Sequence, residues 1–276
     1  MSRLASGDVR LGAREVHVWC RDTTADDEKA LAVAIRTLSP QEGARAARFR
    51  FPHDRRDYIA AHDLLRRTLS RYGSLAPEEW TFTTEPGGRP ALATDANRRP
   101  AAGLTFSLSH TLGFVACAIS DGAPVGVDVE RVDRVGRADD LGDVVWSTSE
   151  AAALRACDAS LRASSATERW TLKEAYAKAT GQGLALPLSS AVFEIREPGA
   201  IGFAGPGGPG GPGGPGGPGG PGGDDQMWQF AVIAPASAEV RVAVALRRPS
   251  AERWRILARL DHDPTAVARV LRESRG

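Results

Sequence analysis

The sequence predicts an α+β fold built from two modest halves. Segments in which apolar residues alternate, such as EVHVWC from residue 15 and GVDVE from residue 126, predict strands. Segments with helical spacing, such as DYIAAHDLLRRTL and ERWTLKEAYAKA, predict long helices. The chain of 276 residues is long enough for one large domain or for two similar halves.

The first half is expected to open with a strand at residues 15–20 and to continue with helices. Pro52 breaks the helical pattern, and the long amphipathic helix after it ends near Gly73. A strand with a Gly-rich turn is expected at residues 78–92. Residues 104–120 then predict two short apolar runs, with Ser109, His110 and Thr111 forming a turn between them.

The second half is expected to open with the acidic strand GVDVE, which two helices and then three strands follow. Ser147 and Glu150 have the spacing of a helix cap, and Gly181 closes the second, longer helix. The apolar runs AVFEIRE, MWQFAVIA and VRVAVALRR predict the three strands.

A repetitive segment lies between the first two of those strands, at residues 205–223, where proline recurs at every third position. Glycine recurs as collagen requires, but about six triplets are too few for a convincing triple helix. The segment is therefore expected to be a flexible extended loop that interrupts a strand pair.

Composition narrows the class of protein. The chain has 35 Lys and Arg against 34 Asp and Glu, so its net charge of +1 does not favour a nucleic-acid binder. Cys20, Cys117 and Cys157 have neither a disulfide framework nor metal-ligand spacing, which predicts a reducing cytoplasm. No stretch approaches the roughly 20 apolar residues of a membrane span, so a soluble protein is expected.

Two carboxylates share one face of the strand GVDVE. Alternation places Asp128 and Glu130 on the face opposite Val127 and Val129, where two like charges repel. A divalent cation would compensate them, and the alternative is an edge strand with a solvated acidic face. Downstream, Glu174 and Lys178 lie one helical turn apart, which also suits an ordinary surface ion pair.

Taken together, the acids and lysines favour phosphoryl-transfer chemistry. Three carboxylates can hold Mg²⁺ through oxygen ligands, and Lys or Arg can neutralise a pyrophosphate. His110 alone would suit a structural histidine, although a histidine among small polar residues can also donate to phosphate.

The pair GVDVE and WTLKEAYAKATGQGL, in this order and about forty residues apart, resembles the signature of the 4'-phosphopantetheinyl transferases of the Sfp type. FSLSH upstream, WSTSE between, and the earlier FRFPHDRRDYIAAHDLLRR and GGRPAL strengthen the resemblance. It covers residues 45–188, roughly half of the chain.

This resemblance implies a pseudo-twofold monomer of two similar α/β halves, residues 1–123 and 124–276, with the Gly-Pro insertion in the second. The implied reaction is Mg²⁺-dependent, with Mn²⁺ as the alternative cation. It transfers 4'-phosphopantetheine from coenzyme A to a serine of an apo acyl or peptidyl carrier protein and releases adenosine 3',5'-bisphosphate. Secondary metabolism and fatty-acid synthesis are the implied pathways.

The resemblance also implies roles for individual residues. The metal-binding acids would be Asp128, Glu130 and Glu174. Glu174, Lys173 and His110 would be catalytic, with Glu174 as the base. The residues that contact coenzyme A would be Arg48, Arg56, Arg89, Ser109, His110, Lys173 and Lys178.

Three positions depart from the family pattern. Arg89 stands where the family usually has lysine, which keeps the charge but changes the donor geometry. His62 and Trp146 also differ, and neither removes a metal ligand. The alternatives are a non-catalytic paralogue that binds coenzyme A and a carrier as a regulatory module, a collagen-like interaction protein and a generic Mg²⁺-dependent phosphohydrolase.

Overall fold

The chain folds into two compact units, seen here in a computed structural model. Unit 1 comprises Met1–Gly122 and Arg255–Val267, and unit 2 comprises Ala123–Trp254 and Ala268–Gly276. The structure describes residues 9–85, 88–93, 103–135, 142–196, 199–206, 225–235, 239–261, 263–267 and 269–274. The expected flexible loop of the Gly-Pro tract lies outside the described residues from position 207 to its end.

Both units combine strands with helices, which confirms the predicted α+β class. The division into halves at residues 123 and 124 and the pseudo-twofold relation remain predictions. The units differ from the expected halves at two places, because Ala123 groups with unit 2 and Arg255–Val267 groups with unit 1. This segment contains β11, which pairs in parallel with the opening strand β1. Among the described helices, none is long and apolar enough to cross a membrane.

The sheet of unit 1 has the strand order β12-β11-β1-β5-β4. Its strands are β1 (Glu15–Asp22), β4 (Leu104–Thr111), β5 (Phe114–Asp121), β11 (Arg255–Leu260) and β12 (Asp263–Val267). A small hairpin joins β2 (Phe82–Thr84) to β3 (Pro90–Leu92), as the Gly-rich turn predicts. The unit's helices are α1 (Glu28–Ala34), α2 (Pro40–Ala46) and α3 (Pro52–Tyr72).

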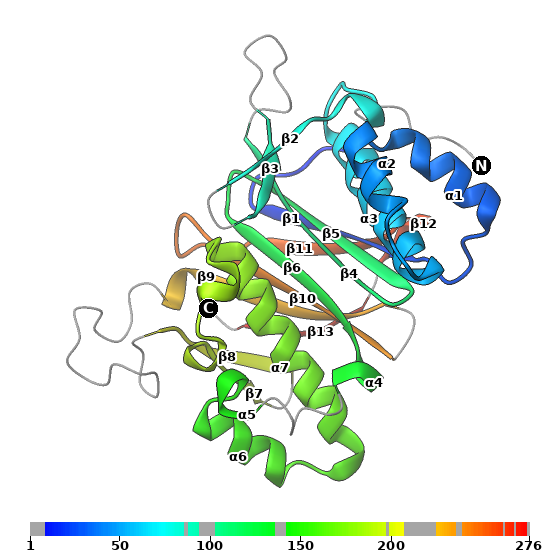
Figure 1. Ribbon diagram of the computed structural model, residues 1–276. Helices are drawn as coiled ribbons and strands as arrows, with labels where there is room; N and C mark the ends of the chain where they lie inside the picture. Colours follow the sequence, from blue (N-terminus) through cyan, green and yellow to red (C-terminus); the bar gives the residue numbers. More distant parts are fainter. Residues whose placement is uncertain are drawn as a thin grey trace. The chain divides into compact units, whose positions relative to one another are not determined.

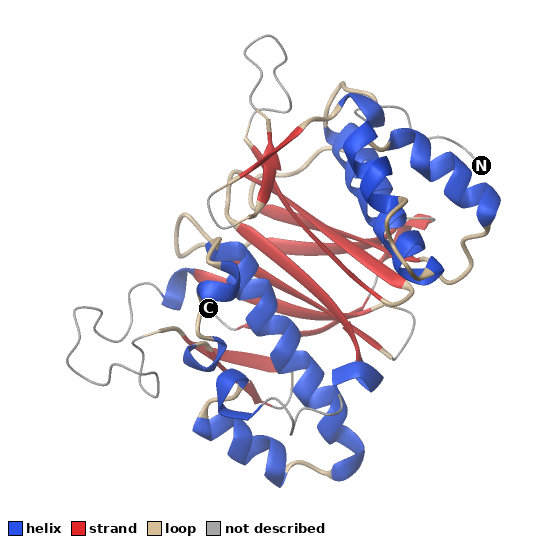
Figure 2. Cartoon of the chain, viewed as in Figure 1, coloured by secondary structure: helices blue, strands red, loops and turns tan. Residues whose placement is uncertain are grey.

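Helix α3 covers one face of this sheet (Figure 2). Pro52 occupies its first turn, where the missing N–H removes no hydrogen bond, and Gly73 follows its end as predicted. The helix buries an apolar stripe against the sheet, where Leu64 and Leu69 pack with Trp19 and Ile119. Burial of these side chains is the main force that holds the helix on the sheet.

Strand β4 corrects one sequence expectation, since Ser109, His110 and Thr111 are not a turn. They are the last three residues of β4 and pair with Ala116, Val115 and Phe114 of β5. The turn lies one step later, at Leu112 and Gly113, and Gly113 takes a φ of 79° that favours glycine. Small polar side chains suggest a turn, but the antiparallel ladder keeps them extended.

The sheet of unit 2 has the order β6-β10-β9-β13-β8-β7. Its strands are β6 (Val125–Arg131), β7 (Val192–Arg196), β8 (Ala200–Ala204), β9 (Trp228–Ala234), β10 (Val240–Arg247) and β13 (Arg269–Ser274). Its helices are α4 (Val132–Val135), α5 (Gly142–Val145), α6 (Thr148–Ala156) and α7 (Ala159–Thr180). Short 3-10 helices occur at Ile35–Thr37, Pro77–Glu79, Gly183–Ala185, Leu188–Ser190 and Asp225–Met227.

Helix α7 is the long helix of unit 2 and packs along β6 and β10 (Figure 1). It ends at Gly181, whose φ of 72° provides the left-handed cap that the sequence predicts. Tyr176 on this helix contacts the rings of Phe203, Trp228 and Phe230 from the sheet. This aromatic packing fixes the rotation of α7 about its own axis, and therefore which of its charged side chains face β6.

Candidate functional site

Strand β6 and helix α7 approach each other closely at Gly126. A Cβ atom at this position would lie 1.9 Å from the carbonyl oxygen of Ala175 and 2.7 Å from the backbone N of Ala179. Only glycine allows the helix backbone to sit this near the strand. Asp128 lies two residues further along β6, on the same face, and is therefore directed at the helix.

Asp128 meets the side chains of α7 at this approach. The Nζ of Lys178 donates to its Oδ1 at 2.7 Å, and Asp128 is only 4 % exposed. Glu174 lies one helical turn before Lys178 and is close enough to Asp128 for mutual repulsion. The structure therefore brings together three of the predicted residues: Asp128, Glu174 and Lys178. A solvated acidic face does not describe this strand, because Asp128 is buried.

The electrostatics of Glu174 follow from this packing. Burial raises the pKa of its carboxyl, the nearby Asp128 carboxylate raises it further, and Lys178 partly offsets both effects. Two carboxylates and one ammonium thus form a cluster in which negative charge exceeds positive charge. Such a cluster favours an additional cation.

The cluster fits a divalent ion, although it is not a complete metal site. Within the described ranges, no three His, Cys, Asp or Glu side chains gather closely enough to hold a metal ion. Asp128 and Glu174 offer the hard oxygen ligands that Mg²⁺ prefers, and Lys178 supplies a cationic group beside Asp128. Glu130 lies two residues after Asp128 on β6, is partly buried, and pairs across the sheet with Arg241.

Lys173 requires a correction, because the structure places it in the interior and not toward a ligand. Its Nζ donates to the carbonyl oxygens of Leu188 at 2.9 Å and Ala191 at 2.5 Å. It also forms an ion pair with Glu150 at 2.8 Å, and both side chains are 0 % exposed. An ammonium has three N–H donors, so these partners leave none for a phosphate.

Glu150 is a residue whose full role the sequence did not reveal. It closes the predicted capping box with Ser147 at the start of α6, and its Oε1 also accepts from the backbone N of Phe193. The pKa of Lys173 is lowered, because burial lowers it more than the Glu150 carboxylate raises it. The cap motif predicts only the contact with Ser147, since the other two partners are 23 and 43 residues distant in the sequence.

The remaining predicted residues lie in unit 1. Ser109 is buried at the end of β4, and His110 beside it is exposed. Arg89 is held next to the same strand, because its Nη2 donates to the carbonyl oxygen of Phe106 at 3.1 Å. Burial lowers the pKa of Arg89, and Glu85 opposes that effect. The structure thus brings Arg89 to the strand that carries Ser109 and His110.

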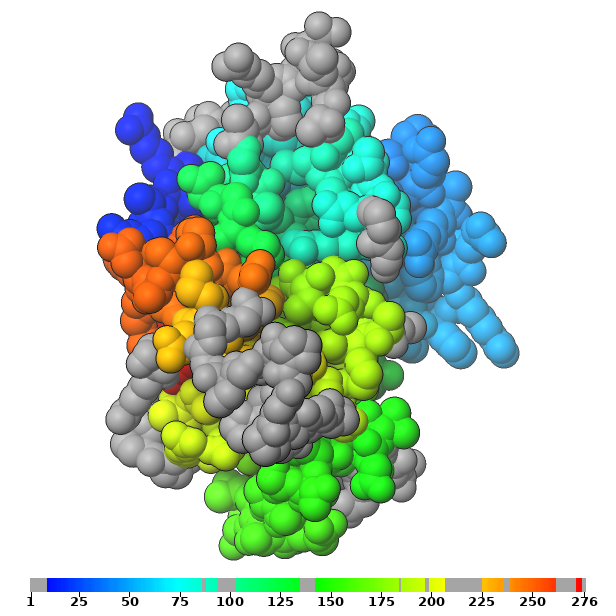
Figure 3. All heavy atoms as spheres, turned by 90° about the vertical axis from the view of Figure 1, so that its left-hand side faces the viewer, coloured from blue at the N-terminus to red at the C-terminus, as the bar shows by residue number. Residues whose placement is uncertain are grey.

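Arg48 and Arg56 lie near the start of α3. Arg48 is exposed, and the neighbouring Phe51 is 49 % exposed and stacks on His53 with ring centroids 5.6 Å apart. The light-blue segment around residue 50 stands at the molecular surface in Figure 3. Arg56 is partly buried, with its Nε 3.5 Å from Asp57 Oδ1.

Both units match known protein families. Residues 124–204 match the 4'-phosphopantetheinyl transferase superfamily, and residues 25–121 match the 4'-phosphopantetheinyl transferase N-terminal family. A solved holo-(acyl-carrier-protein) synthase from Bacillus anthracis in complex with CoA (3',5'-ADP) is 16 % identical. The match covers 46 % of this chain and 96 % of that one, and its TM-score of 0.35 is too low to establish a shared fold.

Two curated relatives establish the family. The 4'-phosphopantetheinyl transferase HetI of Nostoc sp. is 34 % identical over 178 residues, which cover 64 % of this chain and 73 % of the relative. The 4'-phosphopantetheinyl transferase psf-1 of Bacillus pumilus is 30 % identical over 63 % of this chain and 72 % of the relative. The chain belongs to the 4'-phosphopantetheinyl transferase family of enzymes, as its paired motifs predict.

Proposed function

We propose that the enzyme transfers 4'-phosphopantetheine from coenzyme A to a serine of an apo acyl or peptidyl carrier protein. In this reaction the serine oxygen forms a bond to the β-phosphorus as the bond to the bridging pyrophosphate oxygen breaks. Adenosine 3',5'-bisphosphate leaves, and the serine proton passes to a base on the enzyme. The proposal includes a monomeric enzyme that acts in the cytoplasm.

The observation that carries the proposal is the meeting of Asp128, Glu174 and Lys178 between β6 and α7. The motif GVDVE contributes Asp128 to this cluster, and the motif WTLKEAYAKATGQGL contributes Glu174 and Lys178. Phosphoryl transfer depends on positioned charge more than on covalent chemistry, and the cluster supplies charge of both signs on rigid elements.

The acids of the cluster suit Mg²⁺, or Mn²⁺ as the alternative. Asp128 and Glu174 would hold the ion, with Glu130 as a third proposed ligand from the same strand face. When bound, the ion would neutralise negative charge on the pyrophosphate.

The chain's own residues have distinct proposed roles. Glu174 accepts the serine proton, and Lys178 stabilises negative charge on the phosphates. In unit 1, Ser109 and His110 contact the coenzyme A phosphates with Arg89, and Arg48 and Arg56 are further phosphate contacts. Lys173 acts through packing, because Glu150 and two carbonyl oxygens occupy its donors.

An intact-mass experiment tests the proposal. The purified protein is incubated with coenzyme A, Mg²⁺ and apo carrier proteins from fatty-acid, polyketide and peptide synthesis. We expect at least one carrier to gain the mass of a phosphopantetheine group, and the Glu174→Gln variant to give no such gain. Coenzyme A binding without transfer to any carrier would contradict the proposal and favour the regulatory paralogue.

A further inference from the structure

Asp57 on α3 is a buried acid that no sequence motif singles out as functional. It is 2 % exposed, and its two oxygens accept from two different loops. The hydroxyl of Thr23, just after β1, donates to Oδ1 at 2.5 Å. The backbone N–H of Gly113, in the turn between β4 and β5, donates to Oδ2 at 3.0 Å.

The two loops are also bound to each other. The backbone N–H of Thr23 donates to the carbonyl oxygen of Gly113 at 2.9 Å, which closes a three-membered network with Asp57. Thr23 is 0 % exposed, so water does not compete for these bonds. The two loops also pack closely, since a Cβ at Gly113 would lie 2.7 Å from the Thr24 methyl group.

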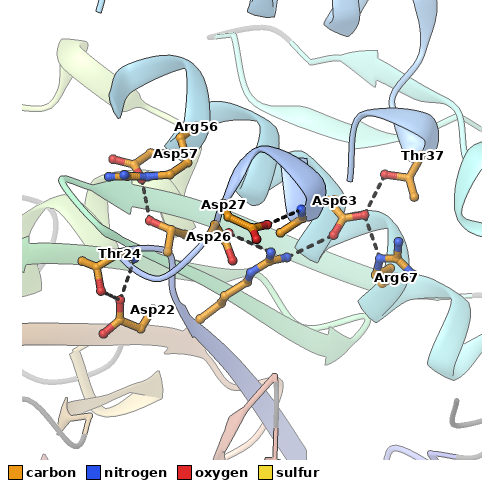
Figure 4. A network of polar contacts seen from close by, with 12 residues as sticks. Asp22, Thr24, Asp26, Asp27, Thr37, Arg56, Asp57, Asp63 and Arg67 are labelled. Carbon is orange, nitrogen blue, oxygen red and sulfur yellow. Dashed lines mark hydrogen bonds and ion pairs between the residues drawn. The ribbon is translucent and has the colours of Figure 1, made fainter. Parts of the chain in front are cut away.

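The clamped turn directly follows the proposed phosphate-binding residues. His110 is three positions before Gly113 and pairs with Val115 across the hairpin, so the position of the turn fixes the end of β4. Asp57 also contacts Arg56, another proposed phosphate contact (Figure 4). A shift of the turn would therefore move His110 relative to its ligand, and displacements on the order of 1 Å are costly in binding sites.

We propose that Asp57 is a positioning residue for coenzyme A binding, whose carboxylate clamps the β4–β5 turn and thereby fixes Ser109 and His110. This inference rests on the proposed function. A purely structural carboxylate would stabilise the fold without any selective effect on coenzyme A.

The same helix offers a matched control. Asp63 lies six residues further along α3, is also 2 % exposed, and accepts from Arg21, Arg67 and Thr37 (Figure 4). None of these partners belongs to the β4–β5 turn. Asp57→Asn and Asp63→Asn therefore make the same chemical change in buried networks on one helix, and only the first touches the turn.

The test measures coenzyme A affinity by calorimetry, together with KM, kcat and Tm, on the full chain. Asp57→Asn turns an acceptor into an amide N–H that faces a donor. We expect it to raise the Kd and KM for coenzyme A about tenfold, with kcat within about threefold. Asp63→Asn should lower Tm without changing the Kd.

Two further variants keep the inference open to refutation. Thr23→Val removes one donor of the clamp while keeping side-chain shape, and should raise the Kd in the same direction even if Asp57→Asn does not fold. In a His110→Ala background, Asp57→Asn should raise the Kd less than it does in the wild type, because part of its effect acts through His110.

Equal effects of Asp57→Asn and Asp63→Asn on the Kd, no effect of Thr23→Val, or full additivity with His110→Ala would each overturn the inference. Failure of the proposed function gives a different result. A wild-type protein that binds coenzyme A but modifies no carrier would reject transfer, while the Kd values would still decide the role of Asp57.

Discussion

Lys173 and Lys178 are five positions apart on α7, and both were expected to meet phosphate. The fold separates their roles. Lys173 is 0 % exposed and surrounded by its acceptors, whereas the Lys178 side chain is 31 % exposed and contacts Asp128 of the proposed site. The sequence motif contains both lysines, but only the packing of α7 shows that Lys178 is the one that contacts Asp128.

This difference predicts opposite phenotypes for two similar substitutions. Lys173→Met leaves Glu150 charged and buried without its cation, so we expect it to lower the free energy of unfolding by ~3–5 kcal/mol. Lys178→Met removes a partly exposed partner from the buried Asp128, so it should lower stability less than Lys173→Met does, by ~1–2 kcal/mol, while it lowers the transfer rate. Urea denaturation and intact-mass kinetics measure the two effects, and equal stability losses would contradict these assignments.

At the scale of secondary-structure elements, the close approach of α7 to β6 depends on Gly126. Gly126→Ala would place a methyl group against the backbone of Ala175 and Ala179, so the helix must shift. We expect the free energy of unfolding to fall by at least ~2 kcal/mol and the transfer rate to fall in the folded fraction, because Glu174 moves with the helix.

Gly43 provides the control for this substitution. It lies within α2, and a Cβ there would meet nothing within 4 Å. Gly43→Ala should therefore raise stability, by up to ~1 kcal/mol, because alanine is the better helix former. If Gly126→Ala proved as well tolerated as Gly43→Ala, the close packing of β6 and α7 would be refuted.

Helices α2 and α3 are joined by an ion pair whose strength depends on pH. Burial alone would raise the pKa of Glu42, but hydrogen bonds from His62 and the Ser39 N–H, together with the charges of His62 and Arg66, lower it from 4.5 to about 2. The contribution of Glu42 to stability is therefore complete above about pH 4.5 and is lost as the pH falls through about 2.

We therefore expect Glu42→Gln to lower stability at pH 7 by about 1–2 kcal/mol, after allowing for solvent screening. Its unfolding free energy should also fall less steeply than that of the wild type between pH 4.5 and pH 2. Denaturation at several pH values checks this, with the exposed Glu78→Gln as the control. Parallel pH profiles for the wild type and Glu42→Gln would contradict the linkage.

At the scale of the whole molecule, the Gly-Pro tract is expected to be dispensable. Described residues at its start and just after it lie close together, because the backbone N of Gly205 donates to Asp225 Oδ1 at 3.2 Å. A short connection can thus replace it without moving β8 or β9. A chain that lacks residues 206–221 should keep its transfer rate within a few-fold, and a large loss of rate would assign the tract a function.

The sequence predicted most elements whose signal is local. The period of the apolar residues, Pro52, Gly73 and Gly181 located the long helices and their ends. It did not predict β8, where Gly202 interrupts a short apolar run, or the C-terminal strands β11, β12 and β13. The parallel pairing of β11 with β1 joins residues about 240 positions apart, and no local pattern encodes it.

The candidate site shows the same limit. The paired motifs predicted that Asp128, Glu174 and Lys178 lie together, and the structure brings them together. The fixed periods of a strand and a helix predict only which residues of one element share a face. The motifs could not show that Lys173 is buried or that Ser109 and His110 end a strand. Burial and pairing depend on contacts with distant segments, such as Leu188 and Ala191 around Lys173 and Val115 opposite His110.

The central claim is that acids from β6 and α7 jointly hold one divalent cation. Electron paramagnetic resonance of Mn²⁺, a stand-in for Mg²⁺, measures this directly in the presence of coenzyme A. We expect the wild type to bind one ion, and both Asp128→Asn and Glu174→Gln to weaken binding at least ~10-fold, while Asp63→Asn leaves it unchanged. Equal Mn²⁺ affinity in the wild type and both site variants would contradict the claim.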